Sequence, residues 1–242
     1  MQGLSAKGSI VVLTGAGISV ESGLPSFRGA DGLWQGFRLE EVATPEAFAR
    51  QPDVVQRFYD ERRRQLLADD IAPNKAHKAL AELERHWAGN FLLVTQNIDD
   101  LHERAGSTSI IHMHGEILKA RCLSCDAVVP WTDDLETAHA CPSCEVVDRL
   151  RPHIVWFGEM PLDLDRIYKA LEGVDLFLAI GTSGQVYPAA GFVQAVNEIG
   201  HACTIELNLE PSTIYQQFDM RRIGPATDTV PALVDELLQI SS

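Results

Sequence analysis

Four of the five cysteines are spaced as the ligands of a metal ion would be. Cys122 and Cys125 form one C-x2-C pair, and Cys141 and Cys144 form a second pair after a gap of 15 residues. Two such pairs can supply the four sulfur ligands of a tetrahedral zinc ion and leave no position open for water, so we expect a structural zinc site. The alternatives are a thiol-exchange pair and reduced thiols without a metal. Cys203 lies in an apolar run and is expected in the core.

Two histidines and two Asx residues carry further chemistry. His112 and His114 alternate along one apolar segment, and an imidazole that titrates near neutral pH can act as a general base. A metal-binding pair and two half-buried rings are the alternatives. Asn97 and Asp99 follow another apolar run, where an amide can hold a hydroxyl and a carboxylate can accept from a carboxamide. Their alternative role is to cap the helix that begins near residues 99–100.

A tyrosine and an arginine three residues apart could bind a carboxylate. Tyr59 and Arg62 lie in the charged helical pattern of residues 52–67, so both can point the same way from a helix. A guanidinium binds a carboxylate through two hydrogen bonds, and a phenol can add a third. The alternative is that Tyr59 belongs to the core and that Arg62-Arg63-Arg64 is a solvated face.

Glycines follow the first apolar run. Gly15-Ala16-Gly17 comes directly after residues 9–13 and opens a helical start at Ile18-Ser19. Backbone amides at such a turn can bind a pyrophosphate, and the dipole of a helix amino terminus favours anions. The third glycine of the usual dinucleotide fingerprint is absent, because Val20 occupies its place. On this motif alone, a tight turn without a ligand is an equal alternative.

The elements that must position these residues alternate between strands and helices. Nearly continuous apolar runs, typical of parallel strands covered on both faces, occupy residues 9–13, 91–94 and 175–180, with a fourth run at 202–207. Helical patterns lie between them at 74–87, 164–171 and 189–198. This order predicts an α/β fold, a Rossmann-like doubly wound parallel sheet, whose ligands bind at the carboxyl ends of the strands. The residues expected there are Thr14-Gly15-Ala16-Gly17, Thr95-Gln96-Asn97, Gly181-Thr182-Ser183 and Asn208.

Two stretches interrupt this alternation. Residues 30–69 and 119–150 are expected to pack together as a smaller, inserted zinc-binding and helical lobe. The core then comprises about residues 1–29, 70–118 and 151–242, within a single catalytic domain of residues 1–242. Two independent domains are the alternative, but no Gly/Ser/Pro-rich linker supports them.

The amino-acid composition limits the kinds of partner that the protein is expected to bind. The 242 residues carry a net charge of −14, which repels phosphate backbones, so we expect no direct nucleic-acid partner, and basic protein segments are favoured. A zinc-ribbon nucleic-acid binder is disfavoured for the same reason. No apolar run reaches the roughly 20 residues that span a bilayer, and residues 1–8 lack the apolar stretch of a signal peptide. We expect a cytoplasmic protein without membrane contact, and the short termini favour a monomer.

Short motifs of distinctive composition run in a fixed order from near residue 10 to residue 226. They comprise the four cysteines and Gly15-Ala16-Gly17-Ile18-Ser19, Gly23-Leu24-Pro25-Ser26-Phe27-Arg28, Thr95-Gln96-Asn97-Ile98-Asp99, His112-Met113-His114-Gly115, Val155-Trp156-Phe157-Gly158-Glu159 and Gly181-Thr182-Ser183. Their order and composition resemble those of the sirtuin family of NAD-dependent protein deacylases. The resemblance covers almost the whole chain.

The resemblance implies a reaction without a catalytic metal. The acyl-lysine oxygen attacks C1′ of the nicotinamide ribose and nicotinamide leaves; the 2′-hydroxyl, activated by a base, then takes over the acyl carbon. The products are free lysine and O-acyl-ADP-ribose. The matching base is His114, and Asn97 and Asp99 match the ribose-positioning and nicotinamide-recognising residues. The cofactor site implied for NAD comprises Gly15, Ala16, Gly17, Ser19, Pro25, Phe27, Arg28, Trp34, Gln96, Asn97, Ile98, Asp99, Gly181, Thr182, Ser183, Asn208, Leu209, Glu210 and Ala226.

One position departs from the family, because most sirtuins carry Asp where this chain has Ser26, just before Phe27. We expect no change of reaction from this difference. Phe27 and Arg28 lie on what resembles the mobile cofactor-binding loop.

The resemblance also implies how acyl-lysine proteins bind. An extended peptide would pair its backbone between residues 185–187 and a strand-like segment that contains Val155, Phe157, Gly158 and Glu159. Tyr59 and Arg62 resemble the signature of the subgroup that removes acidic acyl groups, so we expect acetyl and succinyl substrates, with malonyl as a further candidate. An NAD-dependent mono-ADP-ribosyltransferase and a non-catalytic NAD or ADP-ribose binding module are the alternatives.

Overall fold

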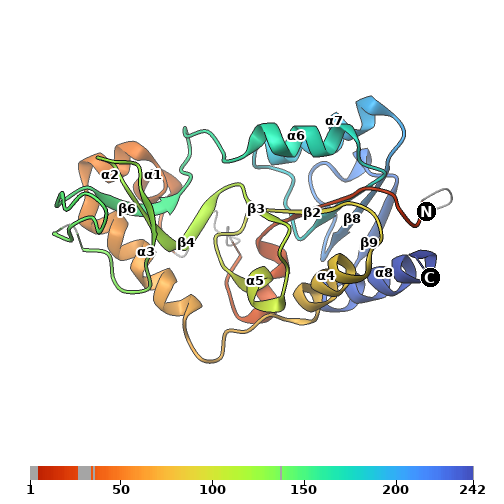
Figure 1. The fold of residues 1–242 in the computed structure, drawn as a ribbon, viewed down its shortest axis with the longest axis horizontal. Coiled ribbons are helices and arrows are strands. Elements are labelled where there is room, and N and C mark those ends of the chain that lie inside the picture. Colours follow the sequence, from red (N-terminus) through yellow and green to blue (C-terminus); the bar gives the residue numbers. More distant parts are fainter. Residues whose placement is uncertain (1–4, 27–33, 35, 137, 242) are drawn as a thin grey trace.

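A six-stranded parallel sheet forms the centre of the larger lobe (Figure 1). The computed structural model describes residues 5–26, 34, 36–136 and 138–241. Across the sheet the strands are β3 (Ile110–His112), β2 (Phe91–Thr95), β1 (Ile10–Thr14), β7 (Leu176–Ile180), β8 (Cys203–Asn208) and β9 (Met220–Ile223). Every neighbouring pair is parallel, so the predicted doubly wound sheet is confirmed.

Helices cover both faces of this sheet, as the nearly continuous apolar strands require. Alternate residues of β1 face opposite layers: Ile10 and Val12 belong to the core under α4 and α8, and Val11 and Leu13 to the core under α6 and α7. Figure 1 shows these two helix pairs on opposite sides of the strands. The helices are α4 (Lys75–His86), α5 (Leu101–Ala105), α6 (Leu164–Glu172), α7 (Phe192–Ile199) and α8 (Ala226–Ser241).

Some elements differ from the prediction. The expected helix start after Gly17 is wrong as an α-helix, because the chain forms two single 3-10 turns, η1 (Ala16–Ile18) and η2 (Val20–Ser22). The helix expected from residue 189 begins with another 3-10 turn, η3 (Ala189–Gly191), and becomes α-helical at Phe192. A fourth 3-10 turn, η4 (Tyr215–Gln217), precedes β9. The edge strands β3 and β9 were not predicted, because three or four residues carry too little pattern.

In the part of the chain that the structure describes, the smaller lobe combines three helices with a three-stranded antiparallel sheet. Its helices are α1 (Leu39–Val42), α2 (Pro45–Arg50) and α3 (Pro52–Leu66), and its sheet has the order β5 (Val128–Pro130), β4 (Gly115–Cys122), β6 (Leu150–Ile154). Helix α3 begins at a proline in its first turn, a position that needs no amide hydrogen. Apolar side chains from α3 and from the ends of β4 and β6 share one core, which includes Phe58, Tyr59, Ile117, Ile154 and Trp156.

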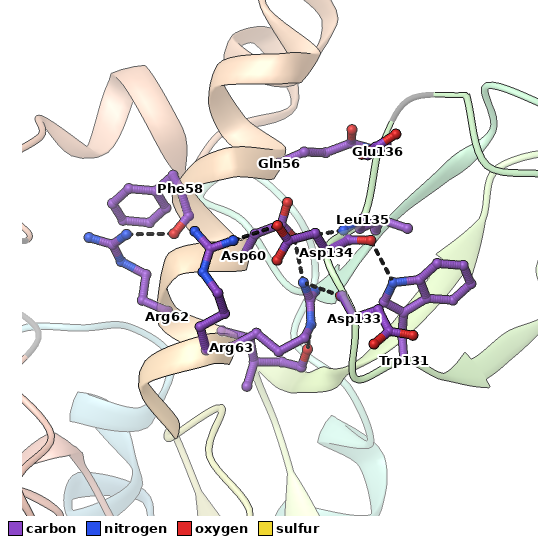
Figure 2. Close-up of polar contacts among 12 residues, drawn as sticks. Gln56, Phe58, Asp60, Arg62, Arg63, Trp131, Asp133, Asp134, Leu135 and Glu136 are labelled. Atoms are coloured by element: carbon purple, nitrogen blue, oxygen red, sulfur yellow. Dashed lines mark hydrogen bonds and ion pairs between the residues drawn. The ribbon is translucent and has the colours of Figure 1, made fainter. Parts of the chain in front are cut away.

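Polar contacts join α3 to the loop after β5 (Figure 2). The Leu135 amide donates to the carboxylate of Asp60 over 2.9 Å, and the same carboxylate pairs with Arg63. Arg63 also donates to the carbonyl oxygens of Ile117, at 3.0 Å, and Asp133, at 3.2 Å. Because Arg63 is fully buried, these acceptors replace the water contacts of its Nε and Nη1 atoms, while Nη2 is buried without a hydrogen-bond partner. Helical and cysteine-bearing segments about 70 residues apart are thereby held together.

Within the described part of the chain, each helix is too short or too polar to span a lipid bilayer.

Candidate active site at the carboxyl edge of the sheet

The loops after β1 and β7 touch through their backbones. The Gly15 amide donates to the carbonyl of Ile180 over 3.0 Å, and the Gly17 amide donates to that of Gly181 over 2.9 Å. A Cβ atom on Gly17 would lie 2.7 Å from the Gly181 Cα, closer than side chains allow. This contact is one physical reason for glycine here, in addition to the phosphate approach that the motif suggested. Ala16 lies between these two anchored residues.

Three polar side chains form a buried cluster beside this glycine loop. The Asn97 amide nitrogen donates to the Ser19 hydroxyl oxygen over 3.1 Å, and that hydroxyl donates to a carboxylate oxygen of Asp99 over 3.0 Å. Each of the three side chains is more than nine-tenths buried. The predicted cofactor residues Ser19, Asn97 and Asp99, which come from two distant segments, therefore meet at one point.

Asp99 also binds a backbone amide at the start of α5. Its other carboxylate oxygen accepts the Leu101 amide at 3.1 Å, whereas the N-cap residue itself is Asp100, whose side chain makes no capping bond. Burial raises the pKa of Asp99 to about 6, and the hydrogen bonds from Leu101 and Ser19 oppose that rise. The Asp99 carboxyl group therefore changes its charge just below neutral pH.

One ring nitrogen of His114 contacts a backbone carbonyl, and the other makes no such contact. Its Nδ1 lies 3.1 Å from the carbonyl oxygen of Gln96. A carbonyl can only accept, so Nδ1 carries the hydrogen and the neutral ring keeps an unprotonated Nε2. Burial lowers the pKa of His114, although the Gln96 contact acts in the opposite direction, so the ring is neutral at pH 7. That is the state a general base needs.

Gly115 explains why the chain can turn directly after His114. Its φ is +84°, and a Cβ there would lie 2.1 Å from the carbonyl oxygen of His153. Glycine lets β4 leave the large lobe and pair at once with β6. His114 therefore sits where the two lobes join, with its own carbonyl accepting the Val155 amide at 2.9 Å.

The remaining cofactor candidates in the second half of the sheet surround the ends of β7 and β8. The side chain of Asn208 donates to the carbonyl of Thr182 over 2.7 Å, and the backbone carbonyl of Asn208 accepts the Gly224 amide at 3.0 Å. These bonds tie together three loops at the sheet edge. Around them Ser183, Leu209 and Glu210 are exposed, and Gly181 and Ala226 are half-buried.

Other cofactor candidates lie at the ends of the first strands or in the small lobe. The Gln96 amide donates to the carbonyl of Thr14 over 2.9 Å, and the carbonyl of Ile98 accepts the Ile117 amide at 2.9 Å. Pro25 is exposed. Trp34 packs edge-on against Phe58 and Tyr59, with ring centroids 4.8 and 5.9 Å away. Phe27 and Arg28 lie outside the described residues.

The expected peptide segment is a turn rather than a strand. Strand β6 ends at Ile154, and the Glu159 amide donates back to the carbonyl of Trp156 over 2.9 Å. Gly158 has a φ of +90°, which breaks an extended strand. Phe157 is part-exposed and its amide donates to the carbonyl of Ala43 over 3.0 Å.

The carboxylate of Glu159 stabilises this turn. It accepts two hydrogen bonds from the buried guanidinium of Arg151, at 2.6 and 2.9 Å, and a third from the Trp156 amide at 2.9 Å. The sequence offered no signal for Arg151, which lies eight residues away on β6. Val155, next to this turn, is fixed by the carbonyl of His114.

Tyr59 and Arg62 lie side by side in the small-lobe core. The hydroxyl oxygen of Tyr59 accepts the indole N–H of Trp156 at 2.9 Å and keeps its own hydrogen for donation. The guanidinium carbon of Arg62 lies 3.3 Å from the ring centroid of Phe58 and 5.7 Å from that of Trp34. The view that Arg62 belongs to a solvated face is wrong, since its side chain is only 7% exposed.

The four predicted zinc ligands converge. The Sγ atoms of Cys122 and Cys144 are 3.7 Å apart, those of Cys125 and Cys141 are 3.8 Å apart, and all four lie within 4.8 Å of one another. In a tetrahedron with Zn–S bonds of about 2.3 Å, neighbouring sulfurs lie about 3.8 Å apart. Amides of Ser124 and Ser143 approach two of the sulfurs at 3.4 Å, a contact that stabilises thiolates. The cluster fits a structural zinc ion.

A parallel sheet with polar side chains at its carboxyl edge, together with a four-cysteine cluster, is typical of a dinucleotide-binding α/β protein with a zinc-binding lobe. The model of the Sir2 family matches residues 15–188. The chain belongs to the Sir2 family, and the membership that the motifs predicted is confirmed.

Relatives and solved structures extend this similarity over the whole chain. An NAD-dependent protein deacylase of Vibrio parahaemolyticus is 55% identical over 97% of each chain, and one of Yersinia pestis is 57% identical over 96% of this chain and 83% of its own. A solved Sir2 homologue–NAD complex superposes with a TM-score of 0.87 at 40% identity, covering 98% of this chain and 92% of that one. A Sir2 complex with a deacetylated p53 peptide and 3′-O-acetyl ADP ribose gives 0.81 at 28% identity, with 94% and 93% covered.

Proposed function

We propose that this protein is an NAD-dependent protein-lysine deacylase that removes acetyl, succinyl and malonyl groups. NAD, the acylated lysine and one water molecule are the substrates, and nicotinamide, O-acyl-ADP-ribose and free lysine are the products. The activity named for the 55–57% identical relatives supports the deacylase reaction, and the acyl range is argued from this chain's own residues.

The observation that carries the proposal is the setting of His114. Its ring is neutral, with Nδ1 bound to the carbonyl of Gln96 and Nε2 able to accept a proton. The carbonyl of Gln96 precedes Asn97, whose side chain belongs to the cluster with Ser19 and Asp99. A ribose bound at Asn97 would lie within reach of the base, and His114 would take the proton of its 2′-hydroxyl.

We propose that the candidate residues at the carboxyl edge of the sheet bind different parts of NAD. We assign the nicotinamide ribose and carboxamide to Asn97 and Asp99, and the pyrophosphate to the glycine loop. The remaining NAD contacts are assigned to Ser19, Pro25, Phe27, Arg28, Trp34, Gln96, Ile98, Gly181, Thr182, Ser183, Asn208, Leu209, Glu210 and Ala226. We propose that the acylated peptide lies along Val155, Phe157, Gly158 and Glu159.

The acyl range rests on Tyr59 and Arg62. The Arg62 guanidinium is charged at neutral pH, since burial lowers its pKa only to about 10. A succinyl or malonyl carboxylate would accept hydrogen bonds from this cation and from the Tyr59 hydroxyl. When an acetyl group is bound instead, the carbonyl and ring of Phe58 and the carboxylate of Glu61 still compensate the charge.

Nicotinamide release from NAD tests the reaction. It is measured with acetyl-lysine, succinyl-lysine and unmodified peptides of one sequence, and we expect release with both acylated peptides only. His114→Asn should lower kcat by roughly 10²- to 10⁴-fold with the fold retained. Release that ignores acylation, with ADP-ribose joined to an acceptor side chain, would favour a mono-ADP-ribosyltransferase. NAD binding without any release would favour a binding module.

We further propose that the protein acts as a cytoplasmic monomer that contacts neither membranes nor nucleic acid. The net charge of −14 supports the last point. Light scattering on the eluting protein should return a mass near 26.6 kDa, and twice that mass would contradict the monomer.

A further inference from the structure

A second histidine holds the carbonyl next to the one that His114 holds. His112 Nδ1 lies 3.3 Å from the carbonyl oxygen of Asn97, and its Nε2 lies 2.5 Å from a carboxylate oxygen of Glu103 on α5. The His112 side chain is 8% exposed, whereas the side chain of Glu103 is 37% exposed. His114 makes the same kind of contact, through Nδ1, to the carbonyl of Gln96. Two alternating imidazoles thus bind two successive carbonyls.

The partners of His112 determine its charge. A peptide carbonyl and an ionised carboxylate are both acceptors, so each ring nitrogen of His112 must carry a hydrogen. The ring is therefore an imidazolium. His114 has no carboxylate at its second nitrogen among the described contacts and is neutral. Both rings contact a backbone carbonyl through Nδ1, but His112 is charged and His114 is neutral.

We propose that His112 is a positioning residue for the deacylase reaction: as an imidazolium held by Glu103, it fixes the backbone of Asn97 so that the Asn97 amide stays directed at Ser19 and at the ribose. The inference rests on the proposed function, because it assigns a purpose to the segment that joins Asn97 to the base. Its consequence is that the two histidines impose opposite proton requirements, a neutral His114 and a charged His112.

Charges around His112 support the imidazolium. Burial lowers its pKa, but the hydrogen bond and charge of Glu103 and the charge of Glu116 outweigh that effect, so the pKa lies above its ordinary value. The same pairing lowers the pKa of Glu103 against the effect of its burial. The other charged or titratable groups that interact with this site are Asp99, Asp100, His102 and Lys119.

Ion pairs between side chains explain why Glu103, His112 and Glu116 lie close together, and a metal ion is not needed. One ligand atom each of Glu103, His112 and Glu116 lies within 4.8 Å of the others. Glu116, however, pairs with Lys119 at 2.5 Å, and Glu103 is bonded to His112. Positive partners already balance both carboxylates.

The pH dependence of kcat/KM for acyl-dependent nicotinamide release tests the proposal. The wild type should show an acid limb from protonation of His114 and Asp99 and an alkaline limb from loss of the His112 proton. Glu103→Gln removes the negative charge but keeps an acceptor, so it should move the alkaline limb down by about one pH unit and leave the acid limb in place. His112→Gln should lower kcat roughly 10- to 100-fold, with the peptide KM and melting temperature unchanged.

Glu236→Gln is the matched control. Glu236 on α8 pairs with Arg222 of β9, the opposite edge strand, so this variant should keep the wild-type profile. Histidine NMR titration gives a readout that needs no turnover: the His112 pKa should exceed about 6.5 and fall in Glu103→Gln.

An unshifted profile in Glu103→Gln, or a His112 signal that titrates at or below its ordinary pKa, would overturn the positioning role while leaving the deacylase intact. A folded wild type without acyl-dependent release would overturn the proposed function, and the positioning role with it.

Discussion

Arg62 remains a cation in the interior of the small lobe because the chain supplies several electron-rich neighbours. Its guanidinium stacks on the ring of Phe58, donates to the Phe58 carbonyl over 2.5 Å and lies 3.5 Å from the carboxylate of Glu61. An acetyl substrate therefore does not leave an uncompensated buried charge. A substrate carboxylate would add a further partner to a side chain already held in place.

The Arg62→Met variant should lower kcat/KM for succinyl-lysine more than for acetyl-lysine. Losing a charged hydrogen-bonding partner should cost succinyl-lysine about 2 kcal/mol in transition-state binding, roughly 30-fold in kcat/KM, with a smaller loss for acetyl-lysine. Arg64→Met is the control, because Arg64 is exposed and pairs with Asp134 at 2.5 Å. The measurement is kcat/KM on matched peptides for both variants. Equal losses for the two substrates in Arg62→Met would remove the specificity role.

At the scale of elements, α3 carries two functions on adjoining faces. Tyr59 and Arg62 face the Trp34 and Trp156 side chains, whereas Asp60 and Arg63 hold the loop of residues 133–135 (Figure 2). Successive residues of a helix are rotated by about 100°, so anchoring one face sets the direction of the other. The loop that anchors α3 leads into the second cysteine pair.

Asp60→Asn should destabilise the small lobe. The change leaves the fully buried Arg63 without its anionic partner, which costs about 3–5 kcal/mol when a buried pair is broken. Asp134→Asn breaks the exposed pair with Arg64 and should cost less than about 1 kcal/mol. Urea unfolding of both variants measures the difference, and similar losses would show that the buried pair contributes no more than the exposed one.

Removing zinc should disorder the antiparallel sheet and loosen α3. Native mass spectrometry should find one zinc per chain, and a strong chelator should increase hydrogen exchange in 115–154 and in α3 while the six-stranded sheet stays protected. Exchange that is unchanged after complete zinc loss would contradict a structural role for the ion.

Elements with long apolar runs and motifs with fixed spacing could be predicted from the sequence; contacts between distant segments could not. The strands β1, β2 and β7 were predicted because they are nearly continuous in apolar residues, and β8 was predicted from a fourth, shorter apolar pattern. The pairing of His112 with Glu103 depends on a turn that folds α5 back over β3, and local periodicity does not encode it. The bond from Trp156 to Tyr59 likewise joins residues 97 positions apart.

At the scale of the whole molecule, buried titratable groups set the response to acid. The rings of His77 on α4 and His102 on α5 meet edge to face, with their centroids 4.8 Å apart. Burial lowers the pKa of His77 to about 4, and burial with the charges of His77 and His112 lowers that of His102. Their stabilising contribution is complete above about pH 6.5 and is lost as the pH falls toward the folded-state values.

Stability should therefore fall between pH 6.5 and 4, with His77 alone contributing a loss of roughly 3 kcal/mol. Asp99 acts in the opposite sense: its pKa is raised to about 6, so it stabilises the fold below its unfolded value and loses that effect as the pH rises through 6. Asp99→Asn should thus steepen the acid loss by about 2 kcal/mol between pH 6 and 4. Urea midpoints at pH 7, 5.5 and 4 measure both slopes, and parallel curves for the two proteins would contradict the raised pKa.

During translation, β1 is synthesised long before β7, the later of its two neighbours in the sheet. Strand β1 pairs with β2 on one side and with β7 on the other, where Ile10 lies opposite Leu176. At a synthesis rate of about 5–20 residues per second, roughly ten to thirty seconds of translation separate the two strands. A nascent chain that stops before Leu176 therefore exposes one edge of a strand in which four of five residues are apolar, and we expect it to be a substrate for chaperones and proteases rather than a partly active enzyme.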